Sequence, residues 1–227
     1  AETARLGAQL LPLSHDALRA CLMATIMRGL ITKPAEVRRM IEQAGAELGV
    51  VGILINNAGI QHVAPIDQFP EDKWDAILAL NLSAAFHSIK AVAKGMRERR
   101  WGRIINIAST HGLVASTGKA AYVAAKHGLV GLTKVAALEF ANDGVTCNAI
   151  CPGWVKTPLV ERQIEARAKR EGVAVERASR DLLDEKQPMH AFPTPEEIGA
   201  LVVFLCSDEA ATMTGAALPI DGGWTAQ

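Results

Sequence analysis

The sequence predicts a doubly wound α/β fold, in which helices cover both faces of a parallel β-sheet. Short, wholly apolar stretches recur along the chain, as expected for strands that are buried on both faces. Longer stretches with helical spacing of their apolar residues lie between them. Strands that alternate with helices in this way pair in parallel. The 227 residues contain no repeat, low-complexity tract or linker, so we assign 1–227 to a single domain.

The regular elements begin with a helix that we expect over 33–49, where Thr32 can cap it, Pro34 fits its first turn and Gly49 ends it. The predicted strands are short and apolar, at 50–55, 103–109, 145–151 and 216–221. The other predicted helices lie between the strands, at 70–99, 119–141 and 195–207. Residues 158–190 are mostly polar and helix-prone, which predicts a substrate lid over a site.

Residues 1–31 do not follow this pattern. They contain no strand followed by a glycine-rich turn, and Gly7 and Gly29 are isolated. A dinucleotide-binding fold normally begins with a strand, a glycine-rich loop and a helix whose N-terminus faces the pyrophosphate. We therefore expect the first strand and this loop to be missing. Three explanations stay open: residues omitted at the start, a sequence altered upstream of Thr32, or a variant that no longer binds the dinucleotide.

Charge and cysteine content narrow the classes of function. The 24 basic residues balance the 24 acidic ones, which gives no indication of a nucleic-acid or membrane partner. We find no apolar run near the roughly 18–20 residues that cross a bilayer, and no signal-peptide layout. Cys21, Cys147, Cys151 and Cys206 have no second pair to complete a zinc site, so we interpret them as buried, reduced thiols. We expect a cytoplasmic protein without a metal.

Three residues predict acid–base chemistry. Tyr122 and Lys126 are four apart on the helix expected at 119–141, so they share a face. An ammonium lowers the pKa of a nearby phenol from its usual value near 10, and such a pair can transfer protons. Ser109 ends the strand at 103–109, at the carboxyl edge where parallel sheets bind ligands. Taken alone, the pair is more often a packed tyrosine beside a solvated lysine.

The order of several motifs is more specific than any one of them. NNAG (56–59) follows the first apolar strand, Asn81 lies in the next helix, and Ser109 precedes Tyr122 by 13 residues. YVAAK ends at Lys126, and PGWVKTP (152–158) follows the strand at 145–151. This set resembles the short-chain dehydrogenase/reductase family over about residues 32–227. The resemblance implies a Rossmann-like sheet and a nicotinamide cofactor.

The resemblance also implies a role for each residue. The serine holds the substrate oxygen, the tyrosine transfers the proton, and the lysine binds the nicotinamide ribose and lowers the tyrosine pKa. Asn81 holds a water that links the lysine to solvent. The residues implied to line the cofactor cleft are Asn57, Ala58, Gly59, Tyr122, Lys126, Pro152, Gly153, Val155 and Thr157.

Longer stretches, among them NNAGIQHVAPI, STGKAAYVAAKHG and CNAICPGWVKTPLV, are similar to the bacterial family members that interconvert (R)-3-hydroxybutyrate and acetoacetate with NAD. This similarity implies four polar residues around the substrate carboxylate: Gln61, His111, Lys119 and Gln163. A small anion does need a cation and several donors. Trp154 and Trp224 could close an apolar wall around the methyl end, although Trp224 could equally be a packed anchor for the terminus.

Three hypotheses follow. The first is an NAD-dependent enzyme of ketone-body metabolism that acts on 3-hydroxybutyrate, and the polar set suits such a short free acid. The second is a reductase of the same family for another substrate, such as a 3-oxoacyl thioester. The third is a non-catalytic structural subunit that binds no nucleotide; the missing loop supports it, whereas the intact Ser–Tyr–Lys set argues against it. Family members are commonly tetramers, so we expect a homotetramer. The preference for NAD over NADP rests on the resemblance alone.

Overall fold

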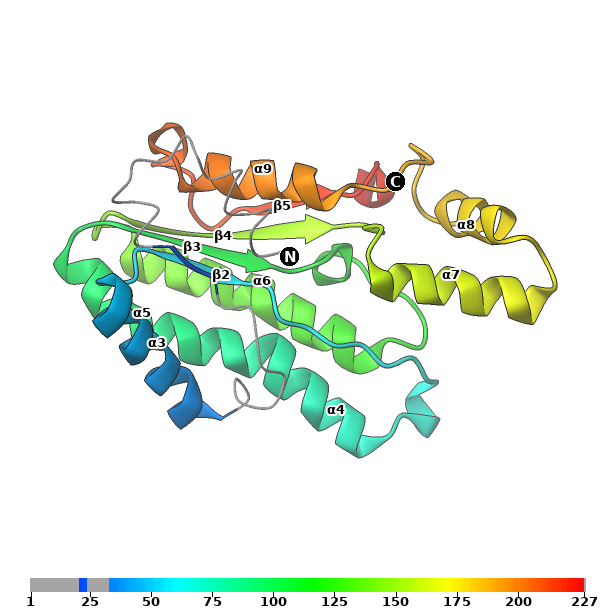
Figure 1. Cartoon of the computed structure of the whole chain (residues 1–227), viewed down its shortest axis with the longest axis horizontal. Coiled ribbons are helices and arrows are strands. Elements are labelled where there is room, and N and C mark those ends of the chain that lie inside the picture. The colour runs from blue at the N-terminus through cyan, green and yellow to red at the C-terminus, as the bar shows by residue number, and fades with distance from the viewer. Residues whose placement is uncertain (1–20, 24–32, 227) are drawn as a thin grey trace.

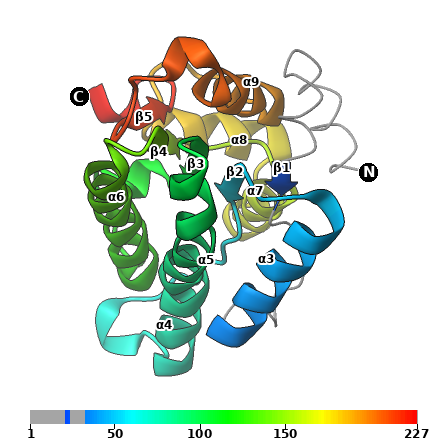
Figure 2. The same cartoon turned by 90° about the vertical axis from the view of Figure 1, so that its left-hand side faces the viewer.

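The computed structural model describes residues 21–23 and 33–226 and contains one five-stranded, all-parallel sheet (Figure 1). The strands lie side by side in chain order: β1 (Cys21–Met23), β2 (Ile53–Asn56), β3 (Gly102–Ile107), β4 (Val145–Pro152) and β5 (Ala217–Ile220). Figure 2 shows that one face is covered by α3 (Pro34–Leu48), α5 (Ala84–Glu98) and α6 (Ala120–Phe140), and the other by α9 (Pro195–Cys206). The predicted doubly wound sheet is confirmed.

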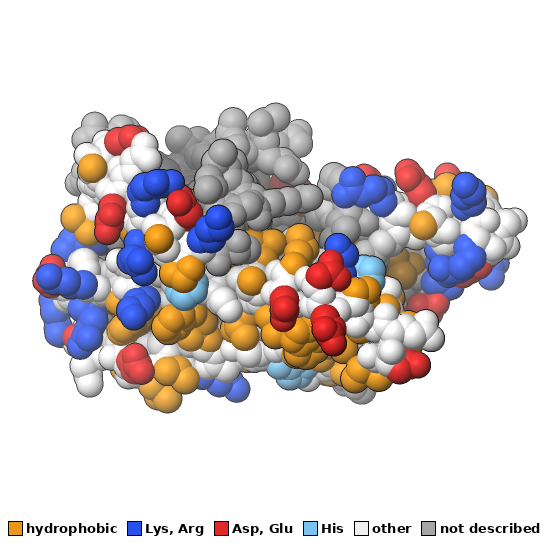
Figure 3. Space-filling model, turned by 90° about the horizontal axis from the view of Figure 1, so that it is seen from below, with side chains coloured by type: hydrophobic (Ala, Val, Ile, Leu, Met, Phe, Trp, Pro, Cys, Tyr) orange, Lys and Arg blue, Asp and Glu red, His pale blue; other side chains and the backbone are white. Residues whose placement is uncertain are grey.

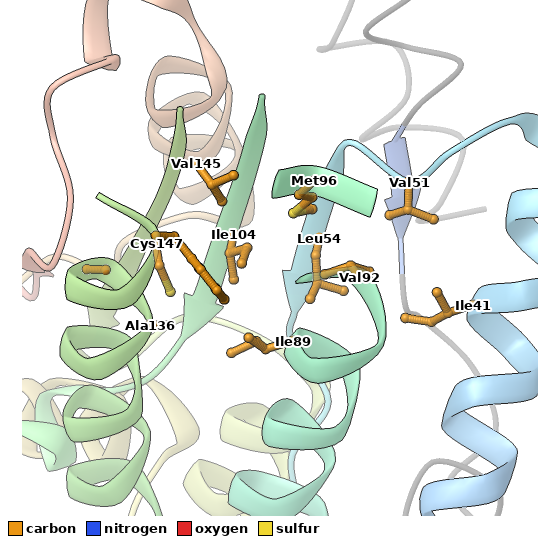
Figure 4. Close-up of a cluster of buried hydrophobic side chains, with 12 residues drawn as sticks. Ile41, Val51, Leu54, Ile89, Val92, Met96, Ile104, Ala136, Val145 and Cys147 are labelled. Atoms are coloured by element: carbon orange, nitrogen blue, oxygen red, sulfur yellow. The ribbon is translucent and has the colours of Figure 1, made fainter. Parts of the chain in front are cut away.

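Alternation along the strands explains why both faces need helices. Leu54 of β2 and Ile104 of β3 point toward α5 and α6, where Ile89 and Val92 meet them (Figure 4). Their neighbours in sequence, Ile53 and Ile105 among them, pack on the opposite face in a cluster with residues of α9. All eight residues of β4 are buried. Strands buried on both faces carry continuous apolar sequence, which is the pattern that predicted them.

Helix ends follow the predicted signals with small shifts. In α3, Pro34 occupies the first turn and Gly49 ends the helix with φ 89°; the cap residue is Lys33, and Thr32 lies outside the described residues. The helix expected over 70–99 consists of α4 (Glu71–Leu78), a π-helical turn (Ala79–Ser83) and α5. Such π-turns are frequent at functional sites, and this one contains Asn81.

Two further helices extend the molecule beyond the carboxyl ends of the strands. They are α7 (Pro158–Glu171) and α8 (Val175–Asp184), seen at the right in Figure 1. They pack on each other through Ile164 of α7 and Ala178 of α8, with other small and aliphatic residues around them. The polar segment predicted as a lid therefore forms a helical pair beside the carboxyl edge of the sheet. Its opening and closing stay a prediction.

Two expectations need correction. We predicted that no strand precedes Thr32, but Cys21–Met23 pairs in parallel with β2, Cys21 opposite Ile53. The open edge of a strand pairs with extended backbone of almost any sequence, so the local pattern gave no signal. The second correction is that β3 ends at Ile107, which places Ser109 just beyond the strand, as the cap of a 3₁₀ turn.

Burial agrees with the interpretation of three cysteines as reduced thiols. Cys147, Cys151 and Cys206 are buried and form no disulfide, while the side chain of Cys21 lies outside the described part. The continuous helical stretch Glu71–Glu98 is long and apolar enough to cross a membrane by length and composition. Packed core helices meet the same criterion, and this stretch packs on the sheet through Ile89.

Candidate active site

A cavity of about 580 Å³ opens at the carboxyl ends of β2, β3 and β4. It gathers residues from segments far apart in the sequence, as parallel sheets do at this edge. The predicted site residues that line it are Asn57, Gly59, Gln61, Ser109, His111, Lys119, Tyr122, Lys126, Pro152, Gly153, Trp154, Val155, Thr157, Gln163 and Trp224. Ala58 and Asn81 instead line a hollow of about 30 Å³ next to Asn57.

The alcohol, the phenol and the ammonium converge as the sequence predicted. Ser109 has extended backbone just after β3, and its side chain hydrogen-bonds to that of Tyr122. One turn further along α6, the Nζ of Lys126 donates to the carbonyl of Ile107 at 2.7 Å. This Nζ lies 5.6 Å from the centroid of the Tyr122 ring. The spacing along α6 and the end of β3 therefore place all three groups at one wall of the cavity.

Burial controls the protonation of this group. It raises the pKa of Tyr122 above its usual value of 10, although the hydrogen bond from Ser109 acts in the opposite direction. It also lowers the pKa of Lys126 to about 8. The sequence predicted a lowered tyrosine pKa. The direction differs because the ammonium of Lys126 is itself buried and donates to Ile107, so desolvation is the larger effect on the phenol.

Lys119 is a buried cation without a carboxylate partner. It precedes the first turn of α6, and only 9% of its surface is exposed. Its Nζ lies over the ring of Trp154, 4.6 Å from the centroid. No Asp or Glu in the described part of the chain lies within 4.0 Å of it. Burial lowers the pKa of Lys119 to about 8. Buried charges are normally paired, so this ammonium has the surroundings of a binding site for an anion.

His111 connects Ser109 to the aromatic side chains of the cavity. Its backbone N–H donates to the Ser109 hydroxyl at 3.1 Å, and its ring packs edge-on against Tyr122 and Trp224. Burial, and then the charge of Lys119, lowers the pKa of His111 to about 3. The imidazole is therefore neutral around pH 7 and offers hydrogen bonds rather than a charge.

Two further contacts close the cavity. The rings of Trp154 and Trp224 lie 5.6 Å apart between centroids, tilted by 34°. Across the cavity, the side chain of Gln163 on α7 donates to the Oε1 of Gln61 at 3.3 Å. The four side chains predicted to bind the carboxylate and the two tryptophans thus all line the same cavity.

Asn81 braces the loop that follows NNAG. Its Oδ1 accepts from the backbone N–H of Ile60 at 2.9 Å, and its Nδ2 donates to the Ile60 carbonyl at 3.0 Å. The side chain is buried and both of its polar ends are bonded within the protein. The role in a water relay stays a prediction; the Oδ1 and the Nδ2 each make one of these bonds, and each can make one more.

Sequence reasoning missed several residues that shape the cavity. Ile198 and Val202 reach it from α9, although nothing in the spacing of that helix shows which end approaches the site. Asp221 was also missed. Its carboxylate accepts from the N–H of Gly223 and from both the N–H and the hydroxyl of Thr225. An aspartate before two glycines is a turn signal that could have indicated it.

The residues present fit the nicotinamide end of a dinucleotide. Of the three N–H donors that an ammonium carries, the structure shows one from Lys126 going to Ile107, which leaves donors for ribose hydroxyls. Beside it, the segment from Pro152 to Thr157 lines the same cavity. The family's phosphate loop follows the first strand, and the residues that follow β1 lie outside the described part.

The fold and the site together define an oxidoreductase with a Rossmann-like sheet. A family model described as enoyl-(acyl carrier protein) reductase matches residues 12–225. The D-beta-hydroxybutyrate dehydrogenases of Cupriavidus necator and Rhizobium meliloti are 59% and 50% identical, each over 87% of this chain and 76% of the relative. The crystal structure of levodione reductase is 32% identical, with a TM-score of 0.80 over 87% of this chain and 75% of that one.

These matches establish the family. The chain belongs to the short-chain dehydrogenase/reductase family, whose members use a nicotinamide cofactor.

Proposed function

We propose that this enzyme interconverts (R)-3-hydroxybutyrate and acetoacetate with NAD. The observation that carries the proposal is the buried ammonium of Lys119, which has no carboxylate partner in the described part of the chain and lines the same cavity as Tyr122 and Ser109. A short 3-hydroxy acid has a carboxylate near its hydroxyl, so one small molecule can meet both groups. The names of the two dehydrogenases reported above support the same substrate.

The chain's own groups divide the work as follows. The ammonium of Lys119 binds the carboxylate, with hydrogen bonds from Gln61, His111 and Gln163 to its oxygens. Ser109 donates to the reacting oxygen, and Tyr122 exchanges a proton with it. Lys126 binds the ribose, and the proton passes between Tyr122, Lys126 and a water near Asn81. A nicotinamide held beside Lys126 would supply the hydride chemistry at C3, as acceptor in oxidation and as donor in reduction.

The protonation state of Tyr122 determines whether a given pH favours reduction or oxidation. Because its pKa is raised, the phenol keeps its proton at neutral pH and can donate it to the oxygen of acetoacetate. Oxidation needs the phenolate, so it should accelerate as the pH rises.

Replacing Tyr122 tests the assignment. Tyr122→Phe keeps the ring that packs against His111 and removes only the hydroxyl. We expect turnover of acetoacetate to fall by at least the roughly 10²–10⁴-fold typical of acid–base groups, with an unchanged melting temperature. Near-normal turnover in a folded variant would refute the proton-transfer role.

A reductase for an acyl thioester is the second candidate, and the match to the enoyl-(acyl carrier protein) reductase family model favours it. The contact between Gln61 and Gln163 and the pair of tryptophans close the cavity around a short acid. Comparing kcat/KM on acetoacetate with that on an acetoacetyl thioester discriminates the two. Titration of NADH, followed by its fluorescence, addresses the remaining idea of a subunit that binds no nucleotide.

Assembly and location complete the proposal. The face below the sheet exposes apolar side chains (Figure 3). The exposed large apolar residues of the helices include Trp74 on α4, Phe86 on α5 and Leu138 on α6. Exposed patches of this kind mark protein interfaces, which supports a homotetramer; light scattering would measure its mass. The buried thiols of Cys147 and Cys151, which form no disulfide in the described part of the chain, support a reducing, cytoplasmic location.

A further inference from the structure

Gln187 is a fully buried amide behind the substrate cavity. Only 1% of its surface is exposed, and it does not line the cavity. Its Oε1 accepts the backbone N–H of Trp154 at 3.0 Å, and its Nε2 donates to the carbonyl of Ala191. Its own backbone N–H donates to Leu183 at the end of α8, at 2.7 Å. A buried amide is costly unless both ends are bonded, and here both ends are.

Two glycines show how closely the chain surrounds this side chain. A Cβ added to Gly153 would lie 2.7 Å from the Oε1 of Gln187, and one added to Gly222 would lie 2.8 Å from its Cγ. Gly222 also has φ +59°, which favours glycine. Gly153 immediately precedes Trp154, and Gly222 lies two residues before Trp224. The segments that carry the two tryptophans therefore both close on Gln187.

Further hydrogen bonds connect the segment that follows α8, which contains Gln187, to the C-terminal turn around Gly222. The N–H of Met189 donates to the Gly222 carbonyl at 3.0 Å. Asp221 fixes the next residues through Gly223 and Thr225, so Trp224 projects from a braced turn. Its ring then packs against Trp154 and His111.

We propose that Gln187 is a positioning residue that sets the spacing between Trp154 and Trp224 and thereby limits the length of substrate that the site accepts. It acts through the backbone of Trp154 and the packing of Gly222, without touching the substrate. The consequence for substrates rests on the function proposed above. The consequence for the two indole rings does not.

The test replaces Gln187 with methionine, which has a similar length but lacks the amide that donates and accepts these hydrogen bonds. The N–H of Trp154 loses its partner, and the loop is free to shift. We expect KM for acetoacetate to rise about tenfold while kcat stays within about threefold, as for a lost binding contact. The preference for acetoacetate over 3-oxohexanoate, measured as a ratio of kcat/KM values, should fall by a similar factor.

Near-ultraviolet circular dichroism supplies a readout that needs no substrate. The difference spectrum of Gln187→Met should resemble that of Trp224→Phe, which removes one indole of the pair. Leu183→Ala is the matched control, because this residue is buried in the same segment and its backbone still accepts from Gln187. It should lower the melting temperature without changing the tryptophan spectrum or the substrate ratio.

An unchanged spectrum and substrate ratio in Gln187→Met would overturn the proposal, as would the same changes in Leu183→Ala. If the wild-type enzyme does not reduce acetoacetate, the proposed function fails, and the spectrum alone still decides whether Gln187 positions the two rings.

Discussion

Replacing Lys119 with methionine should make the protein more stable and less active. The pKa of Lys119 is about 8 against an ordinary 10.5. At about 1.4 kcal/mol per pKa unit, burial of this ammonium costs the folded state roughly 3 kcal/mol at neutral pH. The substitution also removes the favourable contact with the Trp154 ring, which offsets about 0.5–2 kcal/mol of this gain in stability. We therefore expect Lys119→Met to stabilise the fold by roughly 1–2.5 kcal/mol at pH 7, or about 2–10 °C for a chain of this size.

The same substitution removes the cation that we assign to the carboxylate. Hydrogen bonds to charged groups contribute about 1.5–3 kcal/mol, so kcat/KM for acetoacetate should fall roughly 10–150-fold, mainly through KM. Urea unfolding and the oxidation of NADH by acetoacetate measure the two effects. Lys134→Met, at an exposed position of the same helix, is the control and should change neither strongly.

The pH dependence of the folding stability also tests whether Lys119 destabilises the folded state. Below about pH 8, Lys119 is charged in both the folded and the unfolded state, so the cost is fully present. Between about 8 and 10.5 the unfolded chain holds the proton more tightly, so this residue makes the wild type more stable as the pH rises. The variant should lack that rise. A destabilised Lys119→Met, or one with wild-type kcat/KM, would refute the reasoning.

Three further changes test neighbouring parts of the site. Ser109→Ala should lower kcat by roughly 10²–10³-fold and move the pH profile of oxidation upward, because it removes the hydrogen bond that lowers the pKa of Tyr122; an unshifted profile would contradict this. With the pKa of His111 at about 3, KM for acetoacetate should be flat near pH 6.5 and rise above about pH 8 as Lys119 loses its proton; a step near 6.5 in steady-state kinetics would count against it. Trp224→Ala should cost roughly 3–5 kcal/mol in urea unfolding, because this ring is buried against two others; a loss below about 1 kcal/mol would show that the tail is not an anchor.

The sequence predicted those parts of the fold that depend on local pattern. Continuous apolar stretches identified the four longer strands. The rule that parallel strands bind ligands at their carboxyl ends placed Ser109 at the right edge of the sheet, although β3 ends two residues before it. The four-residue spacing of Tyr122 and Lys126 placed both on one side of α6. These predictions needed only the period of a helix, the pairing of strands and the order of motifs.

The remaining features depend on contacts between distant segments. Gln187 lies in a polar stretch of ordinary composition, and only the folded chain brings it between Gly153 and Gly222. The strand β1 forms because an edge is available to it, which no local pattern encodes. The raised pKa of Tyr122 has the same origin, because burial is a property of the assembled site and outweighs the nearby ammonium.

Burial makes the cavity unfavourable for charge until a ligand supplies the opposite sign. It lowers the pKa values of Lys119 and Lys126 to about 8 and raises that of Tyr122. A bound carboxylate next to Lys119 stabilises its ammonium, so anion binding and retention of that proton reinforce each other. The phenol meanwhile stays neutral, which is the form that donates to a ketone. If the proposed function is right, the site at neutral pH is therefore set for reduction of an oxo acid, and the oxidation, which releases a proton overall, gains as the pH rises.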